Sequence, residues 1–358
     1  MGLHFDFTSE QRMLADSVRG LLSRGRAAGG AGKAEVSGTG KRLAEHGVFG
    51  VMSAQVTGGL GLGLTEALAV SLETGRAQAS FPVIETIVAA RALAANRPAI
   101  AEQVLTGELI ATCAASADAE LVPAGSGTQL RGHAFVPFGG LARWLLLPVR
   151  RADSNEPGPW VTAVDLTASG ISVSHASDFD LTYPMFRVDF ETAIDPVDIA
   201  LDRISSLLTV LACGELTGAA EHCLDLSLRH LKERVQFGKP IGVNQSLRHR
   251  AADDWIRVQG MQAAGEYAAA AFDAAPDAPD ARADFERAAH IAKAHCSAAA
   301  RKVAEHAVQV HGGIGFTWGF GLHVPLRRIL RLASAHGDVA HHYDALADTL
   351  LNGNGRSE

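Results

Sequence analysis

The chain has 358 residues and a mass of 37.5 kDa, which allows two or three domains and excludes a single small module. Hydrophobic residues make up 47% and charged residues 20%, and these fractions exclude wholesale disorder. The formal net charge of -7 argues against a protein that binds duplex nucleic acid, because such proteins carry a basic face.

The first third of the chain is patterned as helices, because apolar residues recur on one face of each segment. Thr65 is a plausible N-cap for one of them. Residues 27–40 are rich in Gly and Ala and have almost no apolar bulk, so we expect a mobile loop there. The predicted helices cover residues 8–22, 42–51, 65–76 and 84–105.

The pattern changes near Leu109. From there to about residue 199, short β-compatible runs alternate with Gly, Pro, Asp and Ser, which predicts a small antiparallel sheet or barrel. Long helical patterns then return and are typical of an antiparallel bundle. They cover residues 204–231, 245–272 and 285–310, with one or two further helices in 324–350 and a turn predicted at 276–281. We therefore place a helical domain at 1–108, a β domain at 109–200 and a helical bundle at 201–358.

The compartment is predicted to be the cytoplasm. No apolar run approaches the roughly 18 residues needed to cross a bilayer, so no membrane association is expected. Charges within residues 1–22 forbid a signal-peptide core. The four cysteines are scattered without a CxxC pair, which suits a reducing compartment. His336, His341 and His342 lack metal-ligand spacing, so we expect a solvated helix face and no metal site.

Two segments contain residues suited to chemistry. The first is ERVQFGKPIG at 233–242, followed by Gln245, where a long helix stops. Arg234 can fork onto a phosphate, while Gln236 can donate or accept and Phe237 offers an apolar plate. A surface arginine that complements the helix dipole explains the same pattern, and from this segment alone it is the simpler reading.

The second segment is QVHGGIGFTW at 309–318. Its closely spaced glycines, including Gly312 and Gly313, permit close backbone approach to a flat or anionic ligand. A helix C-cap followed by a tight turn would give the same string. Taken alone, the segment leaves both interpretations open.

Together, RVQFGKPI…NQ and QVHGGIGFTW resemble the acyl-CoA dehydrogenase family. The FDFTSEQ opening and TGGLGLGLTEALAVSLETGR are similar to its amino-terminal helical domain. The resemblance implies an acyl-CoA dehydrogenase-like fold, with an N-terminal all-α domain, a middle β domain and a C-terminal antiparallel four-helix bundle. It also implies FAD as cofactor, an acyl-CoA thioester as substrate and electron-transfer flavoprotein as electron acceptor.

By this resemblance, one set of residues would contact FAD across a subunit interface, with Arg234 at the diphosphate. The set comprises Arg234, Gln236, Phe237, Gln245, Gln309, Gly312 and Gly313. The reaction would be α,β-desaturation, in which a carboxylate removes the α proton and the β hydrogen leaves as hydride to flavin.

The chain also departs from the family. A flavin-contacting segment of the T-E-P-x-A-G-S-D type is replaced by Ala111–Asp118, and the later aromatic flavin segment by Gly132–Gly139. His336 stands where many members have their catalytic Glu, and Glu233 is a second candidate base, near the place where other members carry theirs. These losses resemble the short subunits of heteromeric α2β2 acyl-CoA dehydrogenases of bacterial steroid side-chain degradation.

A paralogous subunit would then complete each site and supply the base in a heterotetramer, with a homo-oligomer as the alternative assembly. Two other functions stay open. One is a structural subunit without catalysis, and the other is a flavin oxidase or monooxygenase of the same architecture.

Overall fold

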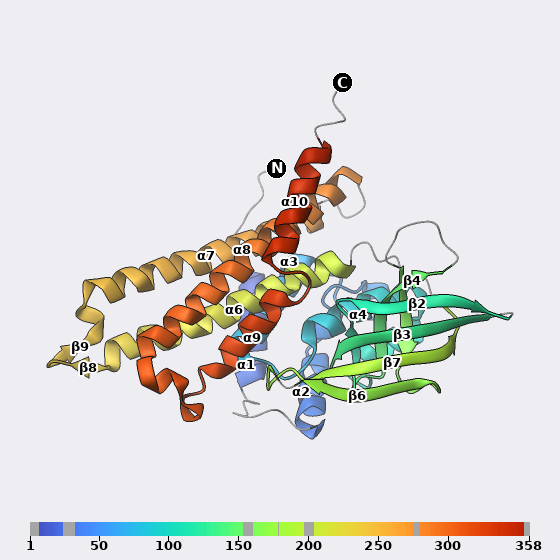
Figure 1. The fold of residues 1–358 in the computed structure, drawn as a ribbon, viewed down its shortest axis with the longest axis horizontal. Helices are drawn as coiled ribbons and strands as arrows, with labels where there is room; N and C mark the ends of the chain where they lie inside the picture. The colour runs from blue at the N-terminus through green and yellow to red at the C-terminus, as the bar shows by residue number, and fades with distance from the viewer. Residues whose placement is uncertain are drawn as a thin grey trace. The chain divides into compact units, whose positions relative to one another are not determined.

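The computed structural model describes residues 7–23, 33–125, 127–152, 160–177, 179–196, 204–274 and 279–353. It divides into two compact units, each of which is described by itself. The first unit combines residues 1–28, 64–79 and 209–358, and the second combines 29–63 and 80–208. The expected order of helical, sheet and helical segments along the chain is confirmed (Figure 1). The domain boundaries after residues 108 and 200 stay predictions.

Three long helices dominate the first unit: α6 (Ile204–Glu233), α7 (Gln245–Ala274) and α8 (Pro279–His311). Short connections link them, so neighbouring helices run antiparallel (Figure 1). The same unit contains α1 (Ser9–Ser23), α3 (Leu64–Ala77), α9 (His323–Ser334) and α10 (Val339–Gly353).

Helices α3 and α6 touch backbone to backbone. A Cβ atom on Gly218 would lie 1.8 Å from the carbonyl oxygen of Leu72, and one on Gly75 would lie 2.0 Å from that of Glu215. No side chain fits at either point, so glycine on each helix sets the distance between them.

The start of α3 is capped from another helix. The carboxylate of Asp273 on α7 accepts hydrogen bonds from the backbone N–H of Leu64 (2.7 Å) and of Thr65 (2.9 Å). A carboxylate at a helix N-terminus also complements the helix dipole. Thr65 is therefore inside the first turn, and the expectation that it forms the N-cap is wrong.

The second unit is built on a seven-stranded mixed sheet with the order β1-β4-β2-β3-β7-β6, in which β5 pairs with β4. Strand β4 runs parallel to β1 and β2, and the other pairs are antiparallel. The strands are β1 (Ala111–Cys113), β2 (Ala117–Ala124), β3 (Gly127–Pro137), β4 (Trp144–Arg151), β5 (Trp160–Asp165), β6 (Ile171–Ser177) and β7 (Met185–Ile194). The helices of this unit are α2 (Lys33–Glu45), α4 (Val83–Asn96) and α5 (Pro98–Leu105), with 3-10 turns η1 (Val48–Gly50) and η2 (Gln55–Thr57).

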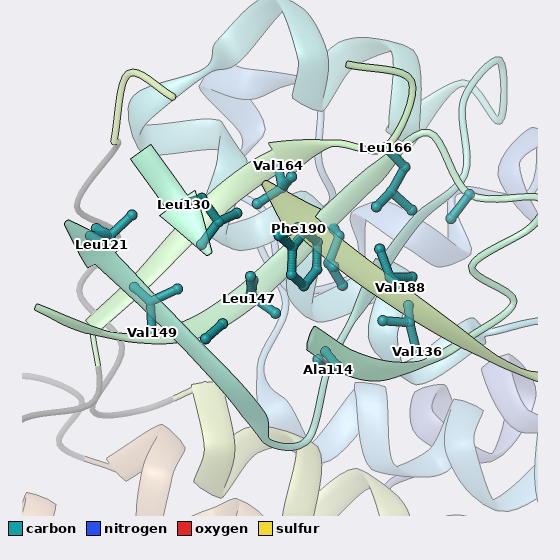
Figure 2. Packing of buried hydrophobic residues seen from close by; sticks show 14 residues of the cluster. Ala114, Leu121, Leu130, Val136, Leu147, Val149, Val164, Leu166, Val188 and Phe190 are labelled. Atoms are coloured by element: carbon teal, nitrogen blue, oxygen red, sulfur yellow. The ribbon is translucent and has the colours of Figure 1, made fainter. Parts of the chain in front are cut away.

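Aliphatic side chains from strands β2, β3, β4, β5 and β7 form the core of this sheet (Figure 2). Leu130, Leu147 and Val188 are fully buried, and Phe190 is the large aromatic of the cluster. Alternate residues of β3 and β7 face this core, which is the period-2 burial expected of strands.

Three local predictions are wrong. Residues 33–40 belong to α2 and not to a loop, while 27–32 lie outside the described residues. The helix expected at 42–51 is the end of α2 followed by η1. In the turn expected at 276–281, residues 279–281 open α8, because Pro is well tolerated at the first position of a helix.

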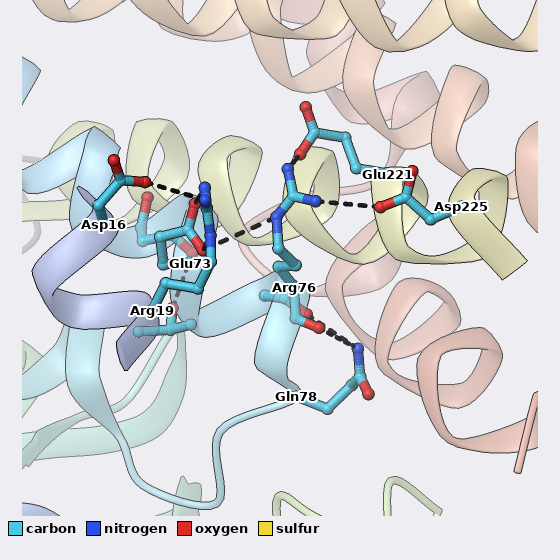
Figure 3. A network of polar contacts seen from close by, with 10 residues as sticks. Asp16, Arg19, Glu73, Arg76, Gln78, Glu221 and Asp225 are labelled. Atoms are coloured by element: carbon cyan, nitrogen blue, oxygen red, sulfur yellow. Dashed lines mark hydrogen bonds and ion pairs between the residues drawn. The ribbon is translucent and has the colours of Figure 1, made fainter. Parts of the chain in front are cut away.

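An alternating ion network joins α1, α3 and α6 (Figure 3). The guanidinium of Arg19 pairs with Asp16 and with the buried Glu73, at 2.9 and 2.6 Å. Arg76 pairs with Glu221 and, at 3.2 Å, with Asp225. Burial, together with Glu73 and Asp225, raises the pKa of Glu221 to about 6, against the opposing effect of Arg76.

The raised pKa of Glu221 predicts a pH-dependent stability. The folded state binds this proton more tightly than the unfolded state does. The contribution of the neutral Glu221 carboxyl to the free energy of unfolding is therefore complete below the ordinary pKa of 4.5 and is lost as pH rises through about 6. We expect this group to lower the free energy of unfolding by about 2 kcal/mol between pH 4.5 and 7.5. Urea unfolding at several pH values measures it. Glu221→Gln should remove this fall in the free energy of unfolding, whereas Glu45→Gln, at an exposed carboxylate, should leave it unchanged. Equal pH profiles for the two variants would contradict the assignment to Glu221.

Candidate cofactor-binding site

A short hairpin follows the end of α6. Strands β8 (Val235–Gln236) and β9 (Lys239–Pro240) pair across a two-residue turn. Both turn residues have positive φ, 52° at Phe237 and 76° at Gly238, which is the type I′ pattern that closes tight hairpins. Phenylalanine rarely adopts this conformation, and here its side chain is 99% exposed.

Arg234 is fixed through its backbone and free at its side chain. Its N–H donates to the His230 carbonyl and its own carbonyl accepts from Ile241, both at 2.9 Å. Among the described residues, no carboxylate pairs with its exposed guanidinium. Glu233 is exposed as the last residue of α6. A guanidinium without a counter-ion on a rigid hairpin is suited to bind an anionic group.

The two glutamines beside the hairpin keep most of their hydrogen-bonding capacity. The Gln236 amide donates to the carbonyl of its neighbour Val235 at 2.9 Å. Gln245, the first residue of α7, lies 3.4 Å from the ring nitrogen Nε2 of His249. Both side chains are exposed, so each has donors or acceptors left for a ligand.

The second motif forms the end of α8 and the 3-10 turn η4 (Gly312–Phe316). Gly312 has φ of 57°, and a Cβ atom on Gly312 or Gly313 would meet nothing within 4 Å. Gln309 is exposed one turn earlier. This is the C-cap geometry foreseen as one alternative, and the space beside the glycines lets a ligand approach the backbone closely.

A histidine pair brings the two motifs together. The rings of His230 on α6 and His311 on α8 are in contact, with centroids 4.5 Å apart and planes tilted by 35°. His230 lies one turn before Arg234, and His311 directly precedes Gly312. The ends of α6 and α8 therefore meet at one end of the helical unit (Figure 1). The pair was not singled out from the sequence, where no spacing rule links two histidines so far apart.

His311 carries an unused acceptor. Its Nδ1 lies 2.7 Å from the carbonyl oxygen of Ala307, so Nδ1 holds the proton and Nε2 is left as an acceptor. That Nε2 is buried and has no partner among the described residues. Burial, then His311 and Arg234, lower the pKa of His230. The orphan acceptor, the open glycine backbone and the free guanidinium together fit a nucleotide diphosphate with its ribose hydroxyls.

In the turn that follows α9, a neutral histidine stands at the position expected for the base. Burial and, to a smaller extent, the positive charge of Lys293 lower the pKa of His336 to about 3. The imidazole is therefore neutral at physiological pH. Lys293 is fully buried and donates to the Gly337 carbonyl at 2.9 Å. His342 approaches the His336 carbonyl through Nε2 at 3.1 Å. Two adjacent carbonyls of the turn are thus held from α8 and α10, and His342 is buried, contrary to the expected solvated face.

In the second unit, polar groups within Ala111–Asp118, which the resemblance compares with a flavin-contacting segment, are already paired. Thr112 Oγ1 donates to the Pro137 carbonyl at 3.0 Å, and the Asp118 carboxylate pairs with Arg150 at 2.8 Å. Cys113 is fully packed in β1. These three side chains are therefore satisfied within the unit.

Over the described ranges, no helix is long and apolar enough to cross a membrane. Within the same ranges, no group of three His, Cys, Asp or Glu side chains is placed to hold a metal ion.

Comparison with known sequences gives two family matches. Residues 8–103 match the acyl-CoA dehydrogenase N-terminal domain, and residues 209–351 match the acyl-CoA dehydrogenase C-terminal domain. The acyl-CoA dehydrogenase FadE34 of Mycobacterium tuberculosis is 31% identical over 299 residues. That match covers 82% of this chain and 38% of FadE34, so the chain spans well under half of this relative.

Solved structures of similar fold cover nearly the whole chain. The Tcur3481-Tcur3483 steroid ACAD superposes with a TM-score of 0.84 at 24% identity, covering 96% of this chain and 98% of that one. The ChsE4-ChsE5 complex of Mycobacterium tuberculosis gives a TM-score of 0.84 at 21% identity, covering 97% and 99%. At these identities the likeness establishes the fold.

Proposed function

Because the chain belongs to the acyl-CoA dehydrogenase family, we propose that it is one subunit of an FAD-dependent enzyme that desaturates an acyl-CoA thioester. The observation that carries the proposal is the meeting of the two motifs at the His230–His311 pair. It gathers a free guanidinium, an open glycine backbone and an orphan acceptor at one end of the helical unit.

This chain's residues would hold the adenosine and diphosphate end of the cofactor. Arg234 would bind the diphosphate. Gly312 and Gly313 would line it with their backbone, and Gln309 with its side-chain amide. Gln236, Phe237 and Gln245 would lie against the flavin from the hairpin side. When bound, FAD accepts the β hydrogen of the acyl group as hydride.

The proton acceptor is assigned to a partner chain, with Glu233 as the candidate within this chain. His336 is unsuited because an imidazole with a pKa of about 3 has little affinity for a proton. Glu233 is exposed to solvent, whereas a base for a carbon acid benefits from burial that raises its pKa. An α2β2 heteromer with a paralogous subunit follows from one retained and one degraded half-site.

The substrate is proposed to be a bulky CoA ester such as a steroid side-chain thioester. The support is that one structural neighbour, the Tcur3481-Tcur3483 protein, is a steroid ACAD. Electron-transfer flavoprotein is the proposed electron acceptor and the cytoplasm the proposed compartment. The alternative function is a structural subunit without catalysis, which is favoured by the exposure of Glu233 and the neutral His336.

Anaerobic titration of the co-expressed complex with a steroid acyl-CoA tests the reaction. We expect bleaching of the flavin absorbance, slow reoxidation in air, and turnover in Glu233→Gln within about twofold of the parent. A loss of about 100-fold or more in that variant would make Glu233 the base. No bleaching with any acyl-CoA would contradict the dehydrogenase function, and fast peroxide formation would indicate an oxidase.

A further inference from the structure

A pair of histidines joins α8 to the first turn of α10. His342 is 2% exposed, and its Nδ1 lies 2.7 Å from Nδ1 of His290 on α8. Its Nε2 lies 3.1 Å from the carbonyl oxygen of His336, in the turn that follows α9. His342 therefore bridges α8 and this turn through its two ring nitrogens.

These contacts fix where the hydrogens of both rings lie. Burial, followed by the positive charge of Lys293, lowers the pKa of His342 to about 4, so its ring is neutral at pH 7. A carbonyl oxygen only accepts, so the one hydrogen of the His342 ring is on Nε2. Its bare Nδ1 must then accept a hydrogen bond from Nδ1 of His290. The arrangement is complete when both rings are neutral.

The backbone of the turn needs this support. His336 and Gly337 have positive φ, 58° and 92°, and for a histidine this conformation costs on the order of 1 kcal/mol. Their carbonyl oxygens are held by His342 at 3.1 Å and by the buried Lys293 at 2.9 Å. A Cβ atom on Gly337 would lie 2.4 Å from Cδ2 of His341, so the turn packs directly against α10. The turn and the start of α10 are therefore held together.

An added positive charge would be poorly compensated beside the histidine pair. Lys293 is fully buried next to it. The two carboxylates of the surroundings are occupied, because Glu286 accepts from Arg282 at 3.1 Å and Asp338 from the N–H of His341 at 2.9 Å. The ionisable groups that act on His290, His336, His342 and Lys293 from the neighbouring elements are Glu286, Arg331, Asp338 and His341.

We propose that His290 and His342 form a proton-operated latch, which holds residues 335–338 and the first turn of α10 closed while both rings are neutral and releases them when the pair takes up protons. A proton on Nδ1 of His342 would face the N–H of His290 and add charge beside Lys293. Release would move His336, at the position expected for the base. The latch is 21 residues of α8 from His311, about 30 Å of helix, so it is independent of the proposed cofactor site.

Hydrogen exchange of the full chain, corrected for the intrinsic effect of pH on exchange, tests the latch. Amides of residues 335–345 should lose protection about 10-fold between pH 7.5 and 5.5 and about 70-fold by pH 4.5. These ratios follow from a pKa of about 4 in the closed state and 6.5 in the released state. Amides in the middle of α7 should stay protected. Unchanged protection at 335–345, or equal loss along α7, overturns the proposal.

His342→Gln separates the hydrogen bonds from the titration. Glutamine can donate to the His336 carbonyl and accept from His290, but it takes up no proton in this pH range. The variant should keep the turn protected at pH 7.5 and lose most of the pH dependence, whereas His342→Ala should open the turn at every pH. His46→Gln, at an exposed histidine of the second unit, should behave like the parent.

A second measurement needs no variant. Ring ¹⁵N spectra of the histidine-labelled parent at pH 7.5 should show a hydrogen on Nε2 of His342 and on Nδ1 of His290. If the spectra show the opposite tautomers, or if His342→Gln keeps the full pH dependence, the pair is not the latch.

Discussion

Replacing Arg234 with alanine in the co-expressed complex should remove most of the bound FAD. The guanidinium has no carboxylate partner among the described residues, and the backbone of Arg234 is held by hydrogen bonds with His230 on α6 and with Ile241 after the hairpin. Loss of a charged hydrogen bond of about 2–3 kcal/mol weakens binding about 30- to 150-fold. Flavin absorbance per protein after gel filtration, followed by titration with added FAD, measures the change.

Arg229→Ala is the matched control for this experiment. Arg229 lies on α6, one turn before the last residue of that helix, Glu233. Like Arg234, it is exposed and has no partner in the described part of the chain. Its removal should leave flavin content within about twofold, because a general loss of positive charge is screened by salt. Equal loss from both variants would show that net charge, and not the hairpin guanidinium, holds the cofactor.

The second large effect is on stability. Arg328 on α9 is fully buried, donates to the Ala79 carbonyl at 2.9 Å, and lies 3.7 Å from the buried carboxylate of Glu215. Arg328→Met would leave that carboxylate with Arg331, at 3.8 Å, as its remaining arginine neighbour. We expect the free energy of unfolding to fall by about 3 kcal/mol, measured by urea denaturation at pH 7.5.

Two further variants decide whether the loss comes from an unpaired charge. Adding Glu215→Gln to Arg328→Met should recover part of the stability, because the buried carboxylate that had lost one of its two arginine neighbours is no longer charged. Arg301→Met, at an exposed arginine of α8, should change it by less than about 0.5 kcal/mol. If the double variant is no more stable than Arg328→Met, packing of the arginine side chain is the main contribution.

The long helices could be predicted because runs of helix-compatible residues between Pro and Gly breaks are a local signal. The error at residues 33–40 has a physical cause. Gly38 and Gly40 lower helix propensity, yet a Cβ atom on Gly40 would lie 2.5 Å from the Phe81 ring, so tertiary packing requires the glycine inside the helix. The Asp273 cap on α3 was equally hidden, because its donors are 209 and 208 residues away.

The site was predictable only through the joint motif. Each segment alone fitted a helix end, and the structure shows that both are helix ends. The contact between the His230 and His311 rings and the burial of Lys293 depend on how the helices pack, which no single segment encodes. The neutral state of His336 likewise follows from burial and the nearby lysine.

The visible spectrum of the purified chain, expressed alone and together with a paralogous subunit, tests the shared site most directly. Alone, the chain should be nearly colourless, since it offers one half of the cofactor contacts. With the second subunit it should copurify with stoichiometric flavin. A yellow homotetramer from this chain alone that oxidises an acyl-CoA would contradict the account.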